Sequence, residues 1–290
     1  MAQELARDMK KYEATLGPHI GDHWRTEGDD RYLVNGNPHG CRHWAKAWNA
    51  RGHQFSNDPA PSSEVLLGRS VDQICGRIQS IIGLKPLAGR INDLLSKAHP
   101  RFFDLLCSME EPLNRYAGAQ MIGGIWESKF PGLAVLMNKE SGEHLDMNGV
   151  RRGWDVLLAL GDFEGGSLYL RDLNVRVPFL PGTLVAFDGT RQRHLIEEFT
   201  GCQRISLVHF VHKSTVLHAG LSPSLPDLNL QDIVSQVSPP TQVLAKRKKT
   251  SRGVGHRFRR GAKVEEADTK AKDATNGEYA REGSKRRSVN

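Results

Sequence analysis

The sequence predicts an α+β protein in which a helical N-terminal half precedes a jelly roll of short strands. In the first half, apolar residues recur at helical spacing, whereas from about Gly132 they form short runs separated by Gly and Pro. Helices that precede the strands, rather than alternate with them, indicate separate layers. Several short strands with turns at this spacing favour a sandwich or jelly roll over a parallel sheet.

The expected helices cover residues 71–82, 88–99 and 102–110, where apolar side chains follow the helical period. Residues 17–63 are rich in Gly, Pro, Asn, Asp and His, which predicts irregular loops that border a site. The expected strands are 133–137, 154–160, 167–170, 175–179, 183–187 and 205–211. We therefore expect a helical and loop region at 1–130, a jelly-roll core at 131–220, and a linker with a tail at 221–290.

The positive charge of the chain is concentrated in its tail. Residues 241–290 hold 15 Lys and Arg against six Asp and Glu, a net of +9, which leaves −2 of the total of +7 for residues 1–240. Large apolar residues are scarce there, so the tail cannot offset its ordering entropy and is expected to be disordered. Its basic clusters suit nuclear import or phosphate contact, although a merely solubilising tail is an alternative.

Compartment and membrane association follow from what the chain contains. No apolar run approaches the roughly 18 to 20 residues of a membrane helix, and the start of the chain is too charged for a secretory signal. Four cysteines are scattered without a Cys-x-x-Cys pair, so neither a disulfide scaffold nor a cysteine zinc site is indicated. We expect no membrane association and, given the basic tail, a nuclear location.

Two ligand-type residues one position apart suggest a metal site. His144 and Asp146 point to the same side of an extended chain while Leu145 points to the other, and His194 adds an imidazole from a distant segment. Two imidazoles and one carboxylate on one face of a metal are typical of non-haem Fe(II). A hydrolytic zinc site, or a surface turn, remains the alternative at this point.

Arg204, ten residues after His194, favours iron over zinc because it gives the site a partner for a keto acid. A guanidinium that points inward beside the metal can hold the distal carboxylate of a dicarboxylate in a bidentate pair. A zinc hydrolase gives Arg204 no role. It would also need a general base, and no Glu is evidently placed for that role.

The stretch from Gly132 to His212 resembles the TET/JBP group of 2-oxoglutarate/Fe(II) dioxygenases, in particular the versions found in fungi. The resemblance rests on His144-Leu145-Asp146, Gly153-Trp154-Asp155, the run from Ala159 to Gly166, Pro181-Gly182-Thr183, His194, and Arg204-Ile205-Ser206 to Phe210. It implies a double-stranded β-helix (jelly-roll) core, Fe(II) as cofactor, 2-oxoglutarate as cosubstrate and ascorbate as a candidate reductant. The implied partner is DNA; protein partners are not indicated.

The resemblance also implies roles for individual residues. His144, Asp146 and His194 match the iron ligands, Arg204 the 2-oxoglutarate anchor, and Lys139 a basic position near the keto acid. Phe210 and His212 match positions that face a base flipped out of the duplex, one by stacking and one by hydrogen bonding. As further substrate contacts we expect Asn114 from the helical half, and Arg151 and Arg152 as phosphate contacts beside the metal loop.

One departure from the family leaves the identity of the methylated base undecided. Some members carry an acidic residue three positions after the metal Asp that reads the cytosine edge, and here Gly149 occupies that position. The expected activity is therefore oxidation of a methylated base, 5-methylcytosine or N6-methyladenine. The alternatives are a hydroxylase of protein or small molecules on the same barrel and, less favoured, a non-catalytic nucleic-acid-binding barrel.

Overall fold

A computed structural model describes residues 33–34, 37–49, 58–66, 71–226, 230–231 and 234. The tail that the sequence predicts to be disordered lies outside these residues, and the expected domain limits remain a prediction. Among the described helices, none combines the length and the hydropathy needed to cross a membrane.

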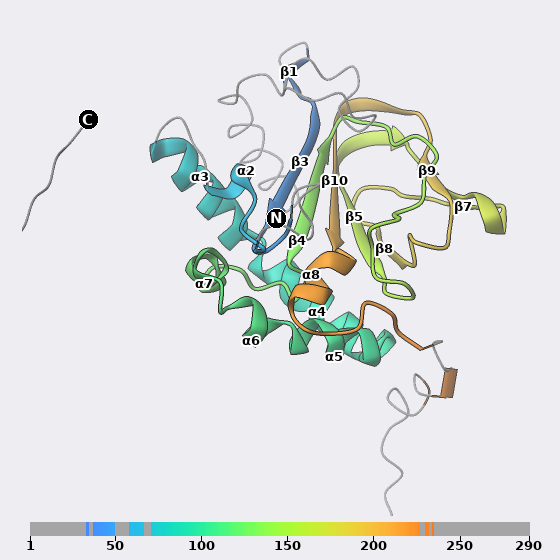
Figure 1. Cartoon of the computed structure of the whole chain (residues 1–290). Coiled ribbons are helices and arrows are strands. Elements are labelled where there is room, and N and C mark those ends of the chain that lie inside the picture. The colour runs from blue at the N-terminus through green and yellow to red at the C-terminus, as the bar shows by residue number, and fades with distance from the viewer. Residues whose placement is uncertain are drawn as a thin grey trace, which may run out of the picture. The chain divides into compact units, whose positions relative to one another are not determined.

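The described part is built in three layers: helices, a large antiparallel sheet and a small antiparallel sheet (Figure 1). The helices are α2 (Ser63–Leu66), α3 (Val71–Gly83), α4 (Lys85–Ala98), α5 (Pro100–Ser108), α6 (Glu110–Leu113), α7 (Ala117–Gly123) and α8 (Lys213–His218). The large sheet has the order β3-β4-β10-β5-β8, with β3 (Gly40–Ala45), β4 (Gly132–Met137), β10 (Phe199–Phe210), β5 (Asp155–Gly165) and β8 (Leu184–Phe187). The small sheet is β7-β6-β9, with β7 (Val175–Val177), β6 (Leu168–Leu170) and β9 (His194–Ile196). A 3₁₀ turn (Arg171–Leu173) and a hairpin of β1 (Leu33–Val34) and β2 (Asn37–Pro38) complete the described elements.

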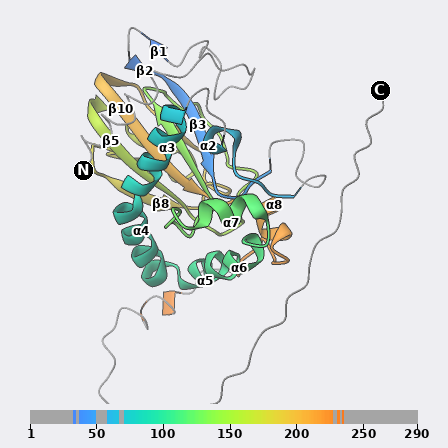
Figure 2. The same ribbon diagram turned by 90° about the vertical axis from the view of Figure 1, so that its left-hand side faces the viewer.

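The helical layer forms because buried apolar residues of the helices share one core with the large sheet. In α4 the stripe is Leu87, Ile91 and Leu95, spaced by four residues and almost fully buried. A proline in the first turn suits the start of this helix, because the N–H that it lacks would have had no partner there. Figure 2 shows α3 lying across the face of the large sheet, with α4 continuing the layer.

Strand β10 separates two hydrophobic cores. Ile205 and Leu207 point to the helical side and belong to the core shared with α3–α7, while the opposite face of the sheet packs on a second core that includes Phe163, Phe179 and Phe187. Because neighbouring side chains of a strand point to opposite faces, the residues at 204, 206, 208 and 210 all face the space between the two sheets. The fold is a jelly roll with a helical layer, as the sequence predicts.

The helices expected at 71–82, 88–99 and 102–110 correspond to α3, α4 and α5. Two expectations are wrong. Residues 40–45, expected to be irregular, form β3, an edge strand paired with β4. β10 starts at Phe199, six residues before the expected start, so Arg204 lies in the middle of the strand rather than at its beginning.

Candidate metal centre

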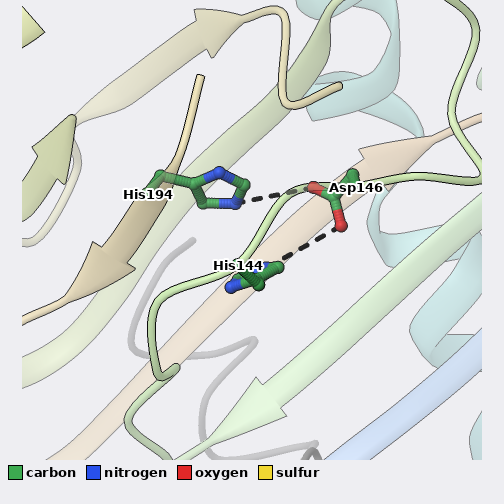
Figure 3. A group of neighbouring side chains, drawn as sticks. All are labelled: His144, Asp146 and His194. Carbon is green, nitrogen blue, oxygen red and sulfur yellow. Dashed lines mark ion pairs between the residues drawn. The ribbon is translucent and has the colours of Figure 1, made fainter. Parts of the chain in front are cut away.

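His144, Asp146 and His194 meet at one place in the structure (Figure 3). One ligand atom from each lies within 4.8 Å of the others. The Nε2 atoms of His144 and His194 lie 3.7 and 3.5 Å from the two oxygens of the Asp146 carboxylate, and the imidazole centroids are 4.2 Å apart. Three ligand atoms at this spacing suit one metal ion bound on a single face.

The outer nitrogen of each imidazole is already engaged, which fixes the tautomer of the neutral ring. Nδ1 of His144 donates to the carbonyl oxygen of Gly142 at 2.7 Å, and Nδ1 of His194 donates to that of Gln192 at 2.9 Å. In the neutral ring the proton then sits on Nδ1, so the lone pair of Nε2 faces the carboxylate. This is the arrangement in which metal-binding histidines are commonly held.

The backbone around the cluster is extended but is not part of a long strand. His144 and His194 form an isolated antiparallel bridge with two hydrogen bonds of 3.0 Å, and the N–H of Asp146 donates to Gly189 at 2.8 Å. A side chain at Gly189 would lie 2.7 Å from an Asp146 oxygen and 2.6 Å from one of Asp155. A side chain at this position would therefore have to displace the two carboxylates between which the glycine lies.

An ion-pair network joins the residues that precede the two histidines. Arg193 binds Asp172 through its side chain and its backbone N–H, at 2.6 to 2.8 Å, and lies 3.8 Å from Glu143, which Arg171 also binds. The hydrogen bonds that Arg193 donates lower the pKa of the exposed Asp172 carboxyl. Glu143 and Arg193 are each adjacent to one histidine of the cluster, so the network ties the two chain segments together.

Arg204 is the buried cation that the sequence predicts. It is 1% exposed, and its guanidinium carbon lies 5.1 to 5.5 Å from the ring centres of Phe163, Phe179 and Phe199. Its Nε and Nη2 have no hydrogen-bond partner among the described residues. Burial lowers the pKa of Arg204 to about 10, while the charge of Glu140 opposes the shift, so the group stays protonated near neutral pH. A buried unpaired cation is costly, and a carboxylate ligand would remove that cost.

Ser206 was not singled out from the sequence. It is 3% exposed on the same face of β10 as Arg204, and its hydroxyl also has no partner within the described part of the chain. The signal was available, because two positions along a strand return to the same face. A hydroxyl and a guanidinium together offer several donors to one carboxylate.

Lys139 follows a residue that is hydrogen-bonded to Arg204. The preceding residue, Asn138, exchanges two hydrogen bonds of 2.7 Å with the backbone of Arg204 and has a positive φ of 48°. Lys139 itself is 8% exposed. Its role near a keto acid remains a prediction.

Phe210 and His212 lie next to the segment that carries Asp146. Their ring centroids are 4.9 Å apart, and His212 forms a bridge with Gly149, three residues after Asp146. The Phe210 ring lies on Gly132, where any Cβ would come within 2.6 Å of it. The structure therefore places this aromatic pair beside the segment that carries Asp146, and its role towards a base remains a prediction.

The remaining predicted contacts are placed differently. Arg151 is exposed, next to the metal loop. Arg152 donates from Nη1 to the carbonyl oxygen of Leu225 at 2.9 Å and accepts at its own carbonyl from His99, so it holds chain segments together, and its role as a phosphate contact remains a prediction. Asn114 lies at the end of α6 beside Gly123 and Lys46, and no contact within the described residues joins it to Phe210 or His212.

Fold and site together define the class of the 2-oxoglutarate- and Fe(II)-dependent oxygenases. Residues 72–213 match the family model Tet_JBP, described as the oxygenase domain of the 2OGFeDO superfamily. The chain therefore carries a TET/JBP-type oxygenase domain and is an Fe(II)- and 2-oxoglutarate-dependent dioxygenase.

One solved structure supports the fold. The chain is similar to NgTET1 in complex with 5mC DNA, with 20% identity, a TM-score of 0.51, and coverage of 80% of this chain and 75% of that one. A 2OG-Fe(II) oxygenase family oxidoreductase from Burkholderia pseudomallei gives 19% identity and a TM-score of 0.24, with coverage of 31% of this chain and 50% of that one. No curated protein matches the chain.

Proposed function

We propose that this protein oxidises the methyl group of a methylated DNA base, 5-methylcytosine or N6-methyladenine. The observation that carries the proposal is the aromatic pair Phe210 and His212, bridged by backbone to Gly149 of the metal-binding segment. A ring that stacks and an imidazole that hydrogen-bonds, side by side, suit a flat heterocycle with a polar edge. The similarity to a TET protein solved with 5mC DNA supports the same substrate class.

In this proposal the cluster His144, Asp146 and His194 holds Fe(II), and Arg204 with Ser206 holds the distal carboxylate of 2-oxoglutarate. The partnerless donors of Arg204 and Ser206 are what the carboxylate would satisfy. Bound Fe(II), with O₂ and 2-oxoglutarate, supplies the oxidising power for hydroxylating a C–H bond. The reaction converts a methyl group, O₂ and 2-oxoglutarate to a hydroxymethyl group, succinate and CO₂.

The protein's own contribution is to select and position the base. A methyl group inside a duplex cannot reach a site between two sheets, so the base must be flipped out, at a cost of a few kcal/mol that stacking on Phe210 offsets. On a 5-methyl group, repeated rounds give hydroxymethyl, formyl and carboxyl products. On an N-methyl group the hydroxylated product loses formaldehyde, which amounts to demethylation.

DNA is the expected partner, with exposed cations beside the site as its phosphate contacts. Arg151 and Lys213 are exposed, and they flank the segment that carries Asp146; the ammonium group of Lys213 donates to the carbonyl oxygen of Met147 at 3.3 Å. Lysine and arginine at such positions bind phosphate without reading sequence. The basic tail adds further charge, and with it we expect a nuclear location.

The test is a direct assay of base oxidation. Duplexes carrying either methylated base are incubated with the full-length protein, Fe(II), 2-oxoglutarate and ascorbate, then digested and analysed by mass spectrometry. We expect an oxidised or demethylated base, and one molecule of succinate for each oxidation. Unchanged bases together with succinate formed on proteins or small molecules would instead establish a different hydroxylase. If no succinate forms under any condition, the chain is a binding protein only.

A further inference from the structure

Four aromatic side chains form a closed cycle of contacts beside the metal-binding segment. His43 stacks on Trp48 at 5.3 Å and 19°, Trp48 lies 6.0 Å from His212, and His212 lies 4.9 Å from Phe210. Phe210 closes the cycle with an edge contact to His43 at 6.1 Å. All four are partly buried, so each keeps surface for a ligand.

Two members of the cycle come from a part of the chain that the family model does not match. His43 lies in β3 and Trp48 follows it, both before residue 72, where the match begins. The register places His43 opposite Ala134 and Ala134 opposite Val208, so His43 shares the inner face of the sheet with Phe210. The backbone of Trp48 is fixed by two hydrogen bonds of 3.0 Å to Ala60.

Gly149 offers no side chain to the edge of a base, so other residues must recognise the base. A Cβ at this position would lie 2.8 Å from the methyl carbon of Thr190 and 3.2 Å from the carbonyl oxygen of Asp146, so no side chain fits without a shift of the surroundings. The metal loop therefore cannot present a polar group at that position to the edge of a base. Recognition of the base falls to the side chains around it.

We propose that Trp48 is a specificity-determining residue, forming with Phe210 and His212 the walls that contact the flipped base, and that His43 positions the indole by stacking on it. The inference rests on the proposed function and deepens it. Aromatic rings stack on any base, so a second ring adds affinity, and its fixed position limits which base outlines are accepted. His43 is a positioning residue, whose backbone N–H is held by Glu64 at 2.5 Å.

The variants Trp48→Ala and Trp48→Phe of the full-length protein test this on duplexes carrying 5-methylcytosine or N6-methyladenine. Loss of one stacked ring should lower base oxidation by roughly 5- to 150-fold for Trp48→Ala, chiefly through a higher KM for DNA. Trp48→Phe should recover most of the activity, and the preference between the two bases should change in Trp48→Ala. Tyr169→Ala is the matched control, because this ring lies on the small sheet against Arg176 and should leave both rates unchanged.

Binding gives a second readout, independent of turnover. Without 2-oxoglutarate, methylated DNA should quench tryptophan fluorescence of the wild type, which has five tryptophans, and much less in Trp48→Phe. Wild-type rates and an unchanged base preference in Trp48→Ala would overturn the inference alone. Equal loss of activity in Trp48→Ala and Trp48→Phe with a lowered melting temperature would also overturn it, in favour of a structural role. If the wild type oxidises no methylated base, the proposed function fails first, and this inference with it.

Discussion

The two faces of strand β10 differ in what their side chains contact. On the helical face, Ile205 and Leu207 are fully buried in an apolar core, where every contact contributes to folding. On the inner face, Arg204 and Ser206 are equally buried, yet they carry polar atoms without partners in the described structure. Burial alone therefore does not distinguish the two faces, whereas the adjacent guanidinium and hydroxyl of Arg204 and Ser206, whose donors have no partner among the described residues, do.

The largest effect should come from the metal centre at the rim of the inner face. His144→Ala or Asp146→Ala removes one of the three ligand groups, and turnover should fall by more than about 100-fold, beyond what loss of an outer partner of a metal ligand costs. Succinate formation and Fe(II) binding would measure this. As a control, the metal-free variants should melt at the same temperature as the metal-free wild type. Substantial residual turnover would contradict the assignment of these residues as metal ligands.

Arg204→Met should weaken 2-oxoglutarate binding without lowering the stability of the ligand-free protein, unlike a truncation on the helical face. Loss of a charged pair with 2-oxoglutarate costs about 2 kcal/mol or more, so the KM for 2-oxoglutarate should rise by roughly 30-fold or more. The ligand-free protein should unfold at the same or a higher denaturant concentration, because an unpaired buried charge has been removed. Arg176→Met, at an exposed arginine, is the control. Unaltered dependence on 2-oxoglutarate would remove the anchoring role.

Leu207→Ala tests the opposite face of the same strand. Truncating a fully buried leucine should lower the free energy of unfolding by about 2 to 5 kcal/mol, measured by denaturant titration. Below its melting temperature the variant should keep the wild-type KM for 2-oxoglutarate. Thr200→Ala, exposed in the same strand, should change stability by less than about 0.5 kcal/mol. A large change in that KM would show that the two faces are coupled.

His209 should make the helical face sensitive to acid. Burial lowers its pKa from 6.5 to about 4, so the unfolded chain binds the proton more readily than the folded one. Stability is then full above pH 6.5 and falls as the pH drops towards 4, by up to about 3 kcal/mol. His209→Leu should flatten this difference in denaturant titrations at a series of pH values. Parallel curves for variant and wild type would rule out His209 as the cause.

The smallest effect should come from the network outside the cluster. Asp172→Asn weakens the hold on Arg193, and Fe(II) affinity should fall by up to about 10-fold as the two histidine segments loosen. Glu197→Gln breaks a comparable surface pair with Arg176 that involves neither Glu143 nor Arg193, and it should leave Fe(II) affinity unchanged. Equal effects in both variants would point to general surface charge instead.

The sequence predicted the features whose residues are close together in the chain or follow a regular pattern, and it missed contacts between distant residues. His144 and Asp146 were found because their spacing is local, and the strands of the jelly roll because Gly and Pro separate their short apolar runs. β3 was missed because its Cys, Arg and His do not alternate between apolar and polar, and its buried Arg42 lies near Glu64, 22 positions away. The role of Asn114 near the base stays a prediction, because proximity across layers cannot be judged from sequence separation.

Strand β3 also bears on how the domain can be isolated. It pairs along the whole of β4, whose sequence Gly-Leu-Ala-Val-Leu-Met contains no charged or polar residue. A fragment cut to residues 72–213 would leave that apolar strand as an open edge, ready to pair with a second molecule. The minimal soluble oxygenase should therefore begin before residue 40, well upstream of the recognisable family domain.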